Sequence, residues 1–221
     1  MQTIWTFGDS FTFGDGCRND KGIIDRNLEY YDKYFKDGYH TWTNILGKLT
    51  GYSVRDLSKS GASNDYIIDS IMNVFNLINQ DDIVIISKTF FERFDIPKLN
   101  DNSFETIYAE TLYGINVYLA SEKSPKNKIQ KETILNFGLL FASNPVIKER
   151  QNNRFNFLKT ILEKKVHKVF VWDVDSELRK SIETIAEHTN YEYNDYHFSF
   201  NGHTQFANIL YKSIFETKTL I

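Results

Sequence analysis

The chain has 221 residues, of which 41% are hydrophobic and 25% are charged, so the composition provides a packed core and disfavours wholesale disorder. The formal net charge of −3 at pH 7 gives no basic footprint of a nucleic-acid-binding protein. The single cysteine, Cys17, excludes an intramolecular disulfide and has no partners for a structural zinc site.

The sequence has no run of about eighteen apolar residues, so we expect no membrane-spanning helix. The N-terminus lacks the basic and long apolar regions of a signal peptide, which favours a cytoplasmic location. The oligomeric state stays open at this point.

Segments rich in β-branched and aromatic residues predict buried strands. Four of these segments are strong and a fifth is weaker; in chain order they are Thr3–Phe7, Tyr52–Leu57, Ile83–Ser87, Val166–Trp172 and the weaker Tyr191–Tyr193.

Apolar residues with helical spacing lie between these strands, over 42–49, 67–78, 155–162 and 206–214. Strands that alternate with helices predict parallel pairing and a sheet covered on both faces. The predicted fold class is therefore α/β, a three-layer sandwich with a mostly parallel, flavodoxin-like sheet. Residues 1–221 are expected to form one domain.

The region 95–154 contains no convincing strand. It has polar stretches, two prolines at Pro125 and Pro145, and helical patches at Phe104–Leu119 and Ile134–Phe141. We interpret it as a helical insertion. It either forms a lid over the carboxyl end of the sheet or packs as a support away from the site.

The first chemically informative stretch is WTFGDSFTFG, over residues 5–14. It places the hydroxyl of Ser10 at the carboxyl end of the first strand, where α/β sheets bind ligands. Thr12 departs from the Gly-x-Ser-x-Gly elbow of the α/β-hydrolases. Gly-Asp-Ser alone also fits an ordinary turn in which serine caps a helix. Cys17 is a much weaker candidate for a nucleophile than Ser10.

The second stretch is NDYHFSFNGH, over residues 194–203. It holds Asp195, then His197, and a Gly-His pair that opens the last helix. Such a loop suits a general base with an orienting partner. We expect a structural role for His203, as a cap or as packing for this loop.

These two stretches resemble the Gly-Asp-Ser block and the last block of the SGNH (GDSL-like) hydrolases, in the same order and at the two ends of the chain. The resemblance implies a serine hydrolase with Ser10 as nucleophile and His197 as general base. That chemistry requires no metal and no organic cofactor. The resemblance spans most of the predicted core but not the insertion at 95–154.

A third stretch, LSKSGASND over residues 57–65, follows the second strand. The resemblance implies that Gly61 provides a backbone N–H to the oxyanion hole, beside the N–H of Ser10. Asn64 either donates from its side chain or caps the following helix. Asp9 is a candidate substrate contact, although a structural acceptor in its turn is the better interpretation.

The third block of the family, Gly-x-Asn-Asp, is replaced here by SKTFFERF at residues 87–94. Thr89 stands where the family has its asparagine oxyanion donor, and its hydroxyl can donate one hydrogen bond. Thr89 is therefore the candidate third donor. The Thr-x-x-Glu-Arg-Phe form resembles a divergent SGNH subset that is often found in phages or bacteria.

The acid of the triad also departs from the family pattern, because Asn194 stands three residues before His197. Asp195 is the favoured orienting residue, since a carboxylate stabilises imidazolium best. The alternatives are Asn194 and a Ser–His dyad, with Asp9, Asp173 and Asp175 as remote options.

The predicted reaction is ester hydrolysis through an acyl-enzyme. The aromatic content of 15% weakly favours a short acyl group on a carbohydrate as substrate. The missing asparagine motivates one alternative, a catalytically impaired glycan-binding protein. A second alternative is an acyltransferase, in which an alcohol replaces water.

Overall fold

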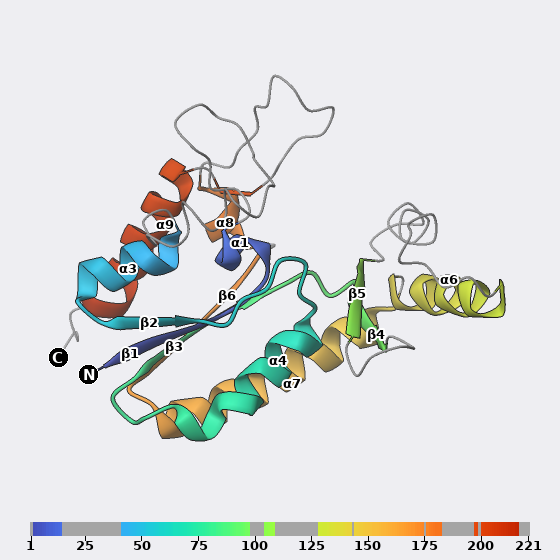
Figure 1. The fold of residues 1–221 in the computed structure, drawn as a ribbon, viewed down its shortest axis with the longest axis horizontal. Coiled ribbons are helices and arrows are strands. Elements are labelled where there is room, and N and C mark those ends of the chain that lie inside the picture. Colours follow the sequence, from blue (N-terminus) through green and yellow to red (C-terminus); the bar gives the residue numbers. More distant parts are fainter. Residues whose placement is uncertain are drawn as a thin grey trace.

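The computed structural model describes residues 2–14, 41–97, 104–108, 128–142, 144–174, 176–182, 197–198 and 200–216. Its centre is a four-stranded parallel sheet with helices on both sides (Figure 1). The strands are β1 (Thr3–Phe7), β2 (Ser53–Asp56), β3 (Ile83–Lys88) and β6 (Lys168–Asp173). The four strong strand predictions are confirmed, whereas the weaker one at Tyr191–Tyr193 lies outside the described residues.

The order of the strands across the sheet is β2-β1-β3-β6. In chain order this is 2-1-3-4, the doubly wound order whose switch point lies beside the first strand. Ile4 of β1 is in register with Val54 of β2 on one side and with Ile83 of β3 on the other. Ligands of such sheets bind beyond the carboxyl ends of the strands at the switch point, which here is the end of β1.

Helices cover both faces of the sheet (Figure 1). One face carries α1 (Ser10–Phe13), α3 (Trp42–Thr50), α8 (Glu177–Lys180) and α9 (Phe200–Tyr211), which runs into a short π-helix, η2 (Lys212–Glu216). The other face carries α4 (Asn64–Val74), the 3-10 turn η1 (Phe75–Leu77) and α7 (Pro145–Lys165). The α/β three-layer prediction is confirmed.

Alternation along the strands divides the core into two layers. In β3, Ile83 and Ile85 pack into the cluster beneath α3 and α9, whereas Val84 and Ile86 pack into the cluster beneath α4 and α7. The cluster under α3 and α9 is rich in buried aromatic rings, namely Phe11, Trp42, Trp172, Phe198 and Phe206. Much of the aromatic content therefore serves the core, where each buried ring contributes roughly 1.5–3 kcal/mol.

The region 95–154 contains strands that the sequence did not predict. Strand β4 (Arg93–Pro97) pairs antiparallel with β5 (Phe104–Tyr108). The predicted helical patch at 104–119 is thus wrong over 104–108, and its remainder lies outside the described residues. Phe104 and Ile107 have a helical spacing, but Thr106, Ile107 and Tyr108 are strand formers, and tertiary pairing decided between the two.

The helical part of the same region is confirmed at 134–141, which lies inside α6 (Lys128–Ala142). Helix α7 begins at Pro145, ten residues before the predicted apolar pattern, with Asn144 as its N-cap. The insertion is therefore mixed, with a strand pair as well as helices.

Strand β4 is attached to the carboxyl edge of the main sheet. The hydroxyl of Ser63, the N-cap of α4, donates to Asp95 Oδ2 at 2.7 Å. The ring of Phe94 packs on that of Phe137 in α6 at 5.0 Å, and α6 extends away from the sheet (Figure 1). The described part of the insertion thus supports the edge of the sheet, and the lid stays a prediction.

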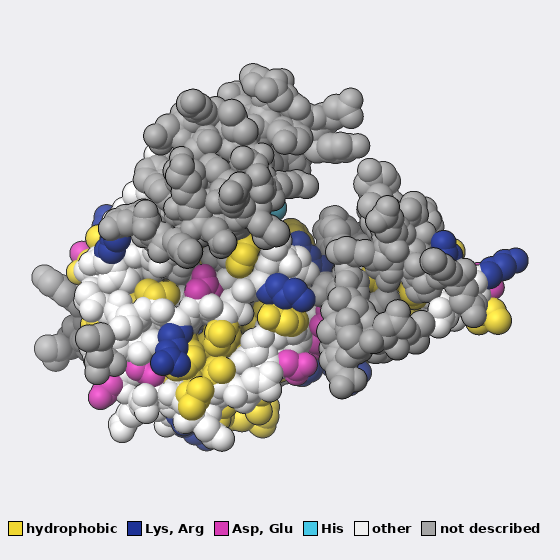
Figure 2. Space-filling model, viewed as in Figure 1, with side chains coloured by type: hydrophobic (Ala, Val, Ile, Leu, Met, Phe, Trp, Pro, Cys, Tyr) yellow, Lys and Arg dark blue, Asp and Glu magenta, His cyan; other side chains and the backbone are white. Residues whose placement is uncertain are grey.

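The surface of the described residues shows charges of both signs. On the face in Figure 2, Lys and Arg side chains are interspersed with Asp and Glu side chains. Among the helices that the structure describes, none is long and apolar enough to cross a bilayer.

Candidate active site

The turn after β1 closes tightly and presents Ser10. A Cβ atom at Gly8 would lie 2.3 Å from Thr12 Oγ1 and 2.7 Å from Ser87 Cβ, so only glycine fits there. Ser10 is the first residue of α1 and is 3% exposed. Its Oγ has no hydrogen-bond partner among the described residues. A buried hydroxyl without a partner is destabilising, by about 1–3 kcal/mol, and the hydroxyls of Thr12 and Ser87 share this state among the described residues.

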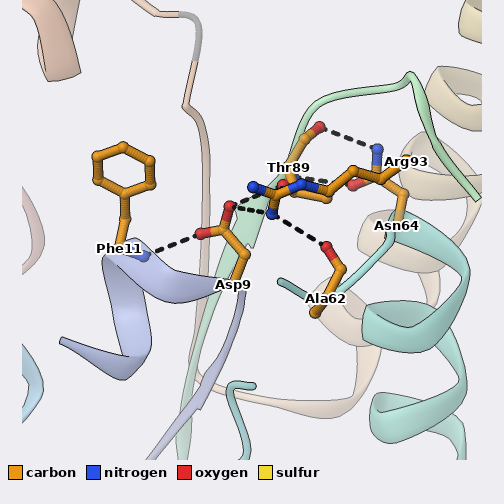
Figure 3. Close-up of polar contacts among 6 residues, drawn as sticks. All are labelled: Asp9, Phe11, Ala62, Asn64, Thr89 and Arg93. Carbon is orange, nitrogen blue, oxygen red and sulfur yellow. Dashed lines mark hydrogen bonds and ion pairs between the residues drawn. The ribbon is translucent and has the colours of Figure 1, made fainter. Parts of the chain in front are cut away.

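Asp9 has a structural role in this turn. Its Oδ1 accepts from the backbone N–H of Phe11 at 3.1 Å and so caps α1. Its Oδ2 accepts from Thr89 Oγ1 at 2.7 Å and from Arg93 Nη1 at 2.9 Å (Figure 3). The side chain is 0% exposed, which leaves no surface for substrate. The interpretation of Asp9 as a turn acceptor fits this geometry, and a substrate contact does not.

The hydroxyl of Thr89 points toward Asp9, and its hydrogen takes part in a hydrogen bond within the protein. It donates its single hydrogen to Asp9 and accepts from Arg93 Nη1 at 2.8 Å. A hydroxyl carries one hydrogen, so Thr89 has none left for an oxyanion in this arrangement. The geometry therefore does not support Thr89 as the third oxyanion donor.

The side-chain amide of Asn64 likewise forms hydrogen bonds within the protein. Its Nδ2 donates to Thr89 O at 3.0 Å and to Gln151 Oε1 at 2.8 Å, and its Oδ1 accepts from Thr89 N at 2.9 Å. These contacts use both amide hydrogens, and the residue is 3% exposed. The helix cap is Ser63, which accepts from Tyr66 N at 3.0 Å. Asn64 thus fixes the end of β3, in place of either predicted role.

The loop after β2 brings Gly61 beside the turn that carries Ser10. Lys59 N donates to Gly8 O at 3.0 Å, which extends the pairing of β1 with β2. Gly61 has φ +71°, a left-handed conformation that favours glycine, and a Cβ built there would meet no atom within 4 Å. Among the described residues, neither the N–H of Gly61 nor that of Ser10 has a hydrogen-bond partner. Both groups are available for an oxyanion.

His197, near the other end of the chain, lies against the turn that carries Ser10. Its ring centroid is 4.8 Å from that of Phe11, the residue after Ser10. Phe198, which is 0% exposed, packs on Phe11 at 5.5 Å. No hydrogen bond joins His197 to Ser10 Oγ in this arrangement. Such bonds are commonly long without substrate and shorten in the bound complex.

Most candidates for the orienting partner of His197 lie outside the described residues. Asn194, Asp195 and Asp175 lie outside them, as does Cys17. Asp173 forms an ion pair with Lys88 at 3.0 Å, which gives it another role. The orienting role of Asp195 remains a prediction.

His203 ties α9 to α3. It is 0% exposed, and its Nδ1 accepts from the backbone N–H of Trp42, in the first turn of α3, at 3.1 Å. The indole N–H of Trp42 in turn donates to Phe11 O at 3.2 Å. This is the structural role expected of His203.

Two carboxyl groups have raised pKa values. At Asp56, desolvation of the carboxyl raises the pKa, although the residue as a whole is exposed to solvent. Its Oδ1 accepts from Ser58 N at 3.0 Å, at the start of the Gly61 loop. Burial, with the neighbouring charge of Asp65, raises the pKa of Asp69 on α4. In the part of the chain that the structure describes, no cluster of three metal-ligating side chains is present.

Sequence reasoning missed the contribution of Arg93 to this site. Its guanidinium reaches back to Asp9, 84 positions earlier in the chain. The only signal was its place in the SKTFFERF stretch, four residues after Thr89. Phe11 and Phe198 were also missed, because apolar residues beside a motif are indistinguishable from ordinary core residues.

Comparisons with known proteins give loose structural likenesses. No protein-family model matches the chain, and no curated protein sequence matches it. It is similar to a protein described as lipolytic, of the G-D-S-L family, from Desulfitobacterium hafniense DCB-2 (TM-score 0.40, 11% identity, 97% of this chain and 100% of that one). A second structure is a member of the lipolytic protein G-D-S-L family from Veillonella parvula DSM 2008 (TM-score 0.40, 13% identity, 98% and 100%).

A third similar structure is a carbohydrate esterase whose active site displays divergent catalytic and non-catalytic binding functions (TM-score 0.38, 11% identity, 99% of this chain and 66% of that one). At such TM-scores, the fold assignment rests on the strand order, register and layers described above.

Proposed function

We propose that this chain is a serine hydrolase that cleaves a carboxylic ester through an acyl-enzyme. One observation carries the proposal: Ser10 Oγ is buried at the carboxyl end of β1 with no hydrogen-bond partner among the described residues. The N–H groups of Ser10 and Gly61, both without partners in the described part of the chain, support it. His197 is placed beside the turn by its contact with Phe11.

The proposed chemistry has two halves. His197 takes the proton of Ser10 as Oγ attacks the ester carbonyl carbon, and the N–H groups of Ser10 and Gly61 bind the oxyanion. When the intermediate collapses, the C–O bond to the alcohol breaks and His197 protonates the leaving alcohol. Water then attacks the acyl group, His197 takes its proton, and the carboxylic acid leaves as Ser10 is reprotonated.

Asp195 is proposed to orient the imidazole of His197 and to stabilise its charged form. We expect Asp195→Ala to lower kcat more than Asn194→Ala, measured on the same ester. The reverse order assigns the orienting role to Asn194, and no loss in either variant indicates a Ser–His dyad.

The proposed substrate is an ester of a short acyl group, with acetylated carbohydrates as the first class to test. The described rings do not argue for a sugar platform, since Trp42, Phe198 and Phe206 are buried in the core. Simple acetyl esters, acetyl sugars and longer acyl esters should therefore be compared side by side.

Labelling with a fluorophosphonate tests the nucleophile directly. We expect the wild-type chain to be modified at Ser10, as located by peptide mass spectrometry. Ser10→Ala and His197→Ala should each lower esterase activity by about a thousandfold or more. A folded wild-type chain that never reacts at Ser10 would overturn the proposal and favour the glycan-binding alternative. An added alcohol that becomes the main acyl acceptor would identify a transferase.

A further inference from the structure

We propose that Arg93 is a positioning residue of this site: its guanidinium joins the Ser10 turn to the Gly61 loop and so sets the spacing of the two oxyanion N–H groups. The inference rests on the proposed function, because it assigns those two N–H groups to the reaction.

The contacts of one nitrogen carry the inference. Arg93 Nη1 donates to Asp9 Oδ2 at 2.9 Å and lies 3.3 Å from the carbonyl oxygen of Ala62 (Figure 3). Asp9 directly precedes Ser10, and Ala62 directly follows Gly61. Each oxyanion N–H is therefore one residue away from an acceptor of the same guanidinium nitrogen.

The third contact attaches this bridge to the sheet. Arg93 Nη1 also donates to Thr89 Oγ1 at 2.8 Å, so its two hydrogens are shared among three acceptors, of which Ala62 O is the most distant. The backbone of Thr89 is held on both sides by Asn64. The guanidinium also lies over the ring of Phe90, 5.2 Å from its centroid. The three segments that end at the site are thus connected through one side chain.

Burial makes the ion pair between Arg93 and Asp9 costly to break. The side chain of Asp9 is 0% exposed and that of Arg93 is 13% exposed. A buried carboxylate that loses its cation is strongly destabilised, so the turn would be expected to rearrange without Arg93. Lysine would keep the charge, but it lacks the planar, rigid fork of donors that guanidinium offers.

This role explains how the chain functions without the asparagine of the family's third block. The hydroxyl that replaces it is directed at Asp9, so the block adds no third side-chain donor. Instead, it contributes an arginine that orders two backbone donors. Because misplacement of reacting groups by about 1 Å can lower a rate by about a hundredfold, such ordering has a large effect on kcat.

The test measures kcat and KM on 4-nitrophenyl acetate for wild type, Arg93→Gly and Arg93→Lys. We expect Arg93→Gly to lower kcat by about a hundredfold with little change in KM. The kcat of Arg93→Lys should lie between those of wild type and Arg93→Gly. Millimolar guanidinium chloride should restore part of the kcat of Arg93→Gly, because the ion can occupy the space of the missing group. The rescue separates positioning from a simple loss of folded protein.

Two matched controls accompany these variants. Arg154 forms an ion pair with Asp65 between α7 and α4, on the sheet face opposite α1, and Arg154→Gly should leave kcat unchanged with or without guanidinium. Asp82 is 2% exposed and accepts from Trp5 Nε1 at 2.9 Å, at the amino end of the sheet. Asp82→Asn should therefore lower the melting temperature while the folded fraction keeps its kcat.

The outcomes are distinguishable. A wild-type chain that fails to react with fluorophosphonate at Ser10 overturns both proposals. If wild type reacts, an Arg93→Gly variant with wild-type kcat overturns the role of Arg93 alone. So does a folded Arg93→Gly variant whose lost kcat does not respond to guanidinium, since the loss then has another origin.

Discussion

Ser10 sits between two residues whose contacts hold it in place. Asp9 is bonded to Arg93 and Thr89, and Phe11 packs against His197, whereas the hydroxyl of Ser10 has no partner in the described structure. Rigid neighbours around an unsatisfied polar group are the arrangement expected of a preorganised site, because the reacting atom must be free while its position is fixed.

Gly61 allows the proposed oxyanion hole to be tested at one residue. Gly61 and Gly51 have φ values of +71° and +73°, and a Cβ at either position meets nothing within 4 Å. An alanine at either site is therefore strained by conformation alone, at a cost of about 1 kcal/mol. We expect similar losses in the free energy of unfolding from Gly61→Ala and Gly51→Ala, measured in urea.

Activity should separate these two variants. Gly51 ends α3, whereas the N–H of Gly61 is proposed to bind the oxyanion. Alanine keeps the N–H but disfavours the φ of +71° that directs it. We therefore expect Gly61→Ala to lower kcat about tenfold, less than the roughly hundredfold or more that loss of a full oxyanion donor costs. Gly51→Ala should keep the wild-type kcat. Equal kcat values would show that the left-handed conformation of residue 61 does not control the reaction.

At the scale of elements, the site is built where β1, β2 and β3 end. The pairing of β1 with β2 continues beyond the strands, through Leu57 N to Thr6 O and Lys59 N to Gly8 O. These bonds hold the Gly61 loop along the turn that carries Ser10. The carboxyl of Asp56, at the end of β2, accepts from Ser58 and so shapes the start of the same loop.

The raised pKa of Asp56 predicts how pH affects the stability of this strand end. Because the folded state holds this proton more tightly than the unfolded state, the carboxyl stabilises the fold less as pH rises from the ordinary value of 3.8 through the raised pKa. Asparagine keeps an oxygen that can accept from Ser58. We therefore expect the free energy of unfolding of Asp56→Asn, minus that of wild type, to be larger at pH 7 than at pH 4.

Urea unfolding at the two pH values measures this difference. Asp81→Asn, on the exposed turn before β3, controls for the loss of one negative charge. If Asp56→Asn and Asp81→Asn show the same change between pH 4 and pH 7, burial of the Asp56 carboxyl does not control the stability of the strand end.

At the scale of the whole molecule, local sequence patterns predicted the sheet well and the contacts of the site less well. The run IVIIS identifies β3 because its β-branched residues suit a strand buried on both faces. The hydrogen bond of Arg93 to Asp9 spans 84 positions, and no local pattern marks it. Thr89 was placed correctly at the end of β3, but the direction of its hydroxyl depends on those distant partners.

Phe198 joins the two ends of the chain in the core. Its ring packs on Phe11 at 5.5 Å and on Phe206 at 5.3 Å, and both Phe198 and Phe206 are 0% exposed. Truncation of either ring creates a cavity in the same cluster, so each alanine variant should lose about 3–5 kcal/mol of unfolding free energy.

The two variants should differ in activity, because Phe198 adjoins His197 whereas Phe206 lies on α9, facing the core. We expect the kcat of Phe198→Ala to be about tenfold or more below that of Phe206→Ala. Both values are measured per folded molecule at a temperature where both variants are folded. Without its ring, residue 198 no longer anchors the neighbouring His197 in the core, while His203 still ties α9 to α3. Equal kcat values in the two variants would show that the loop bearing His197 is anchored elsewhere, and that the packing of Phe198 on Phe11 serves stability alone.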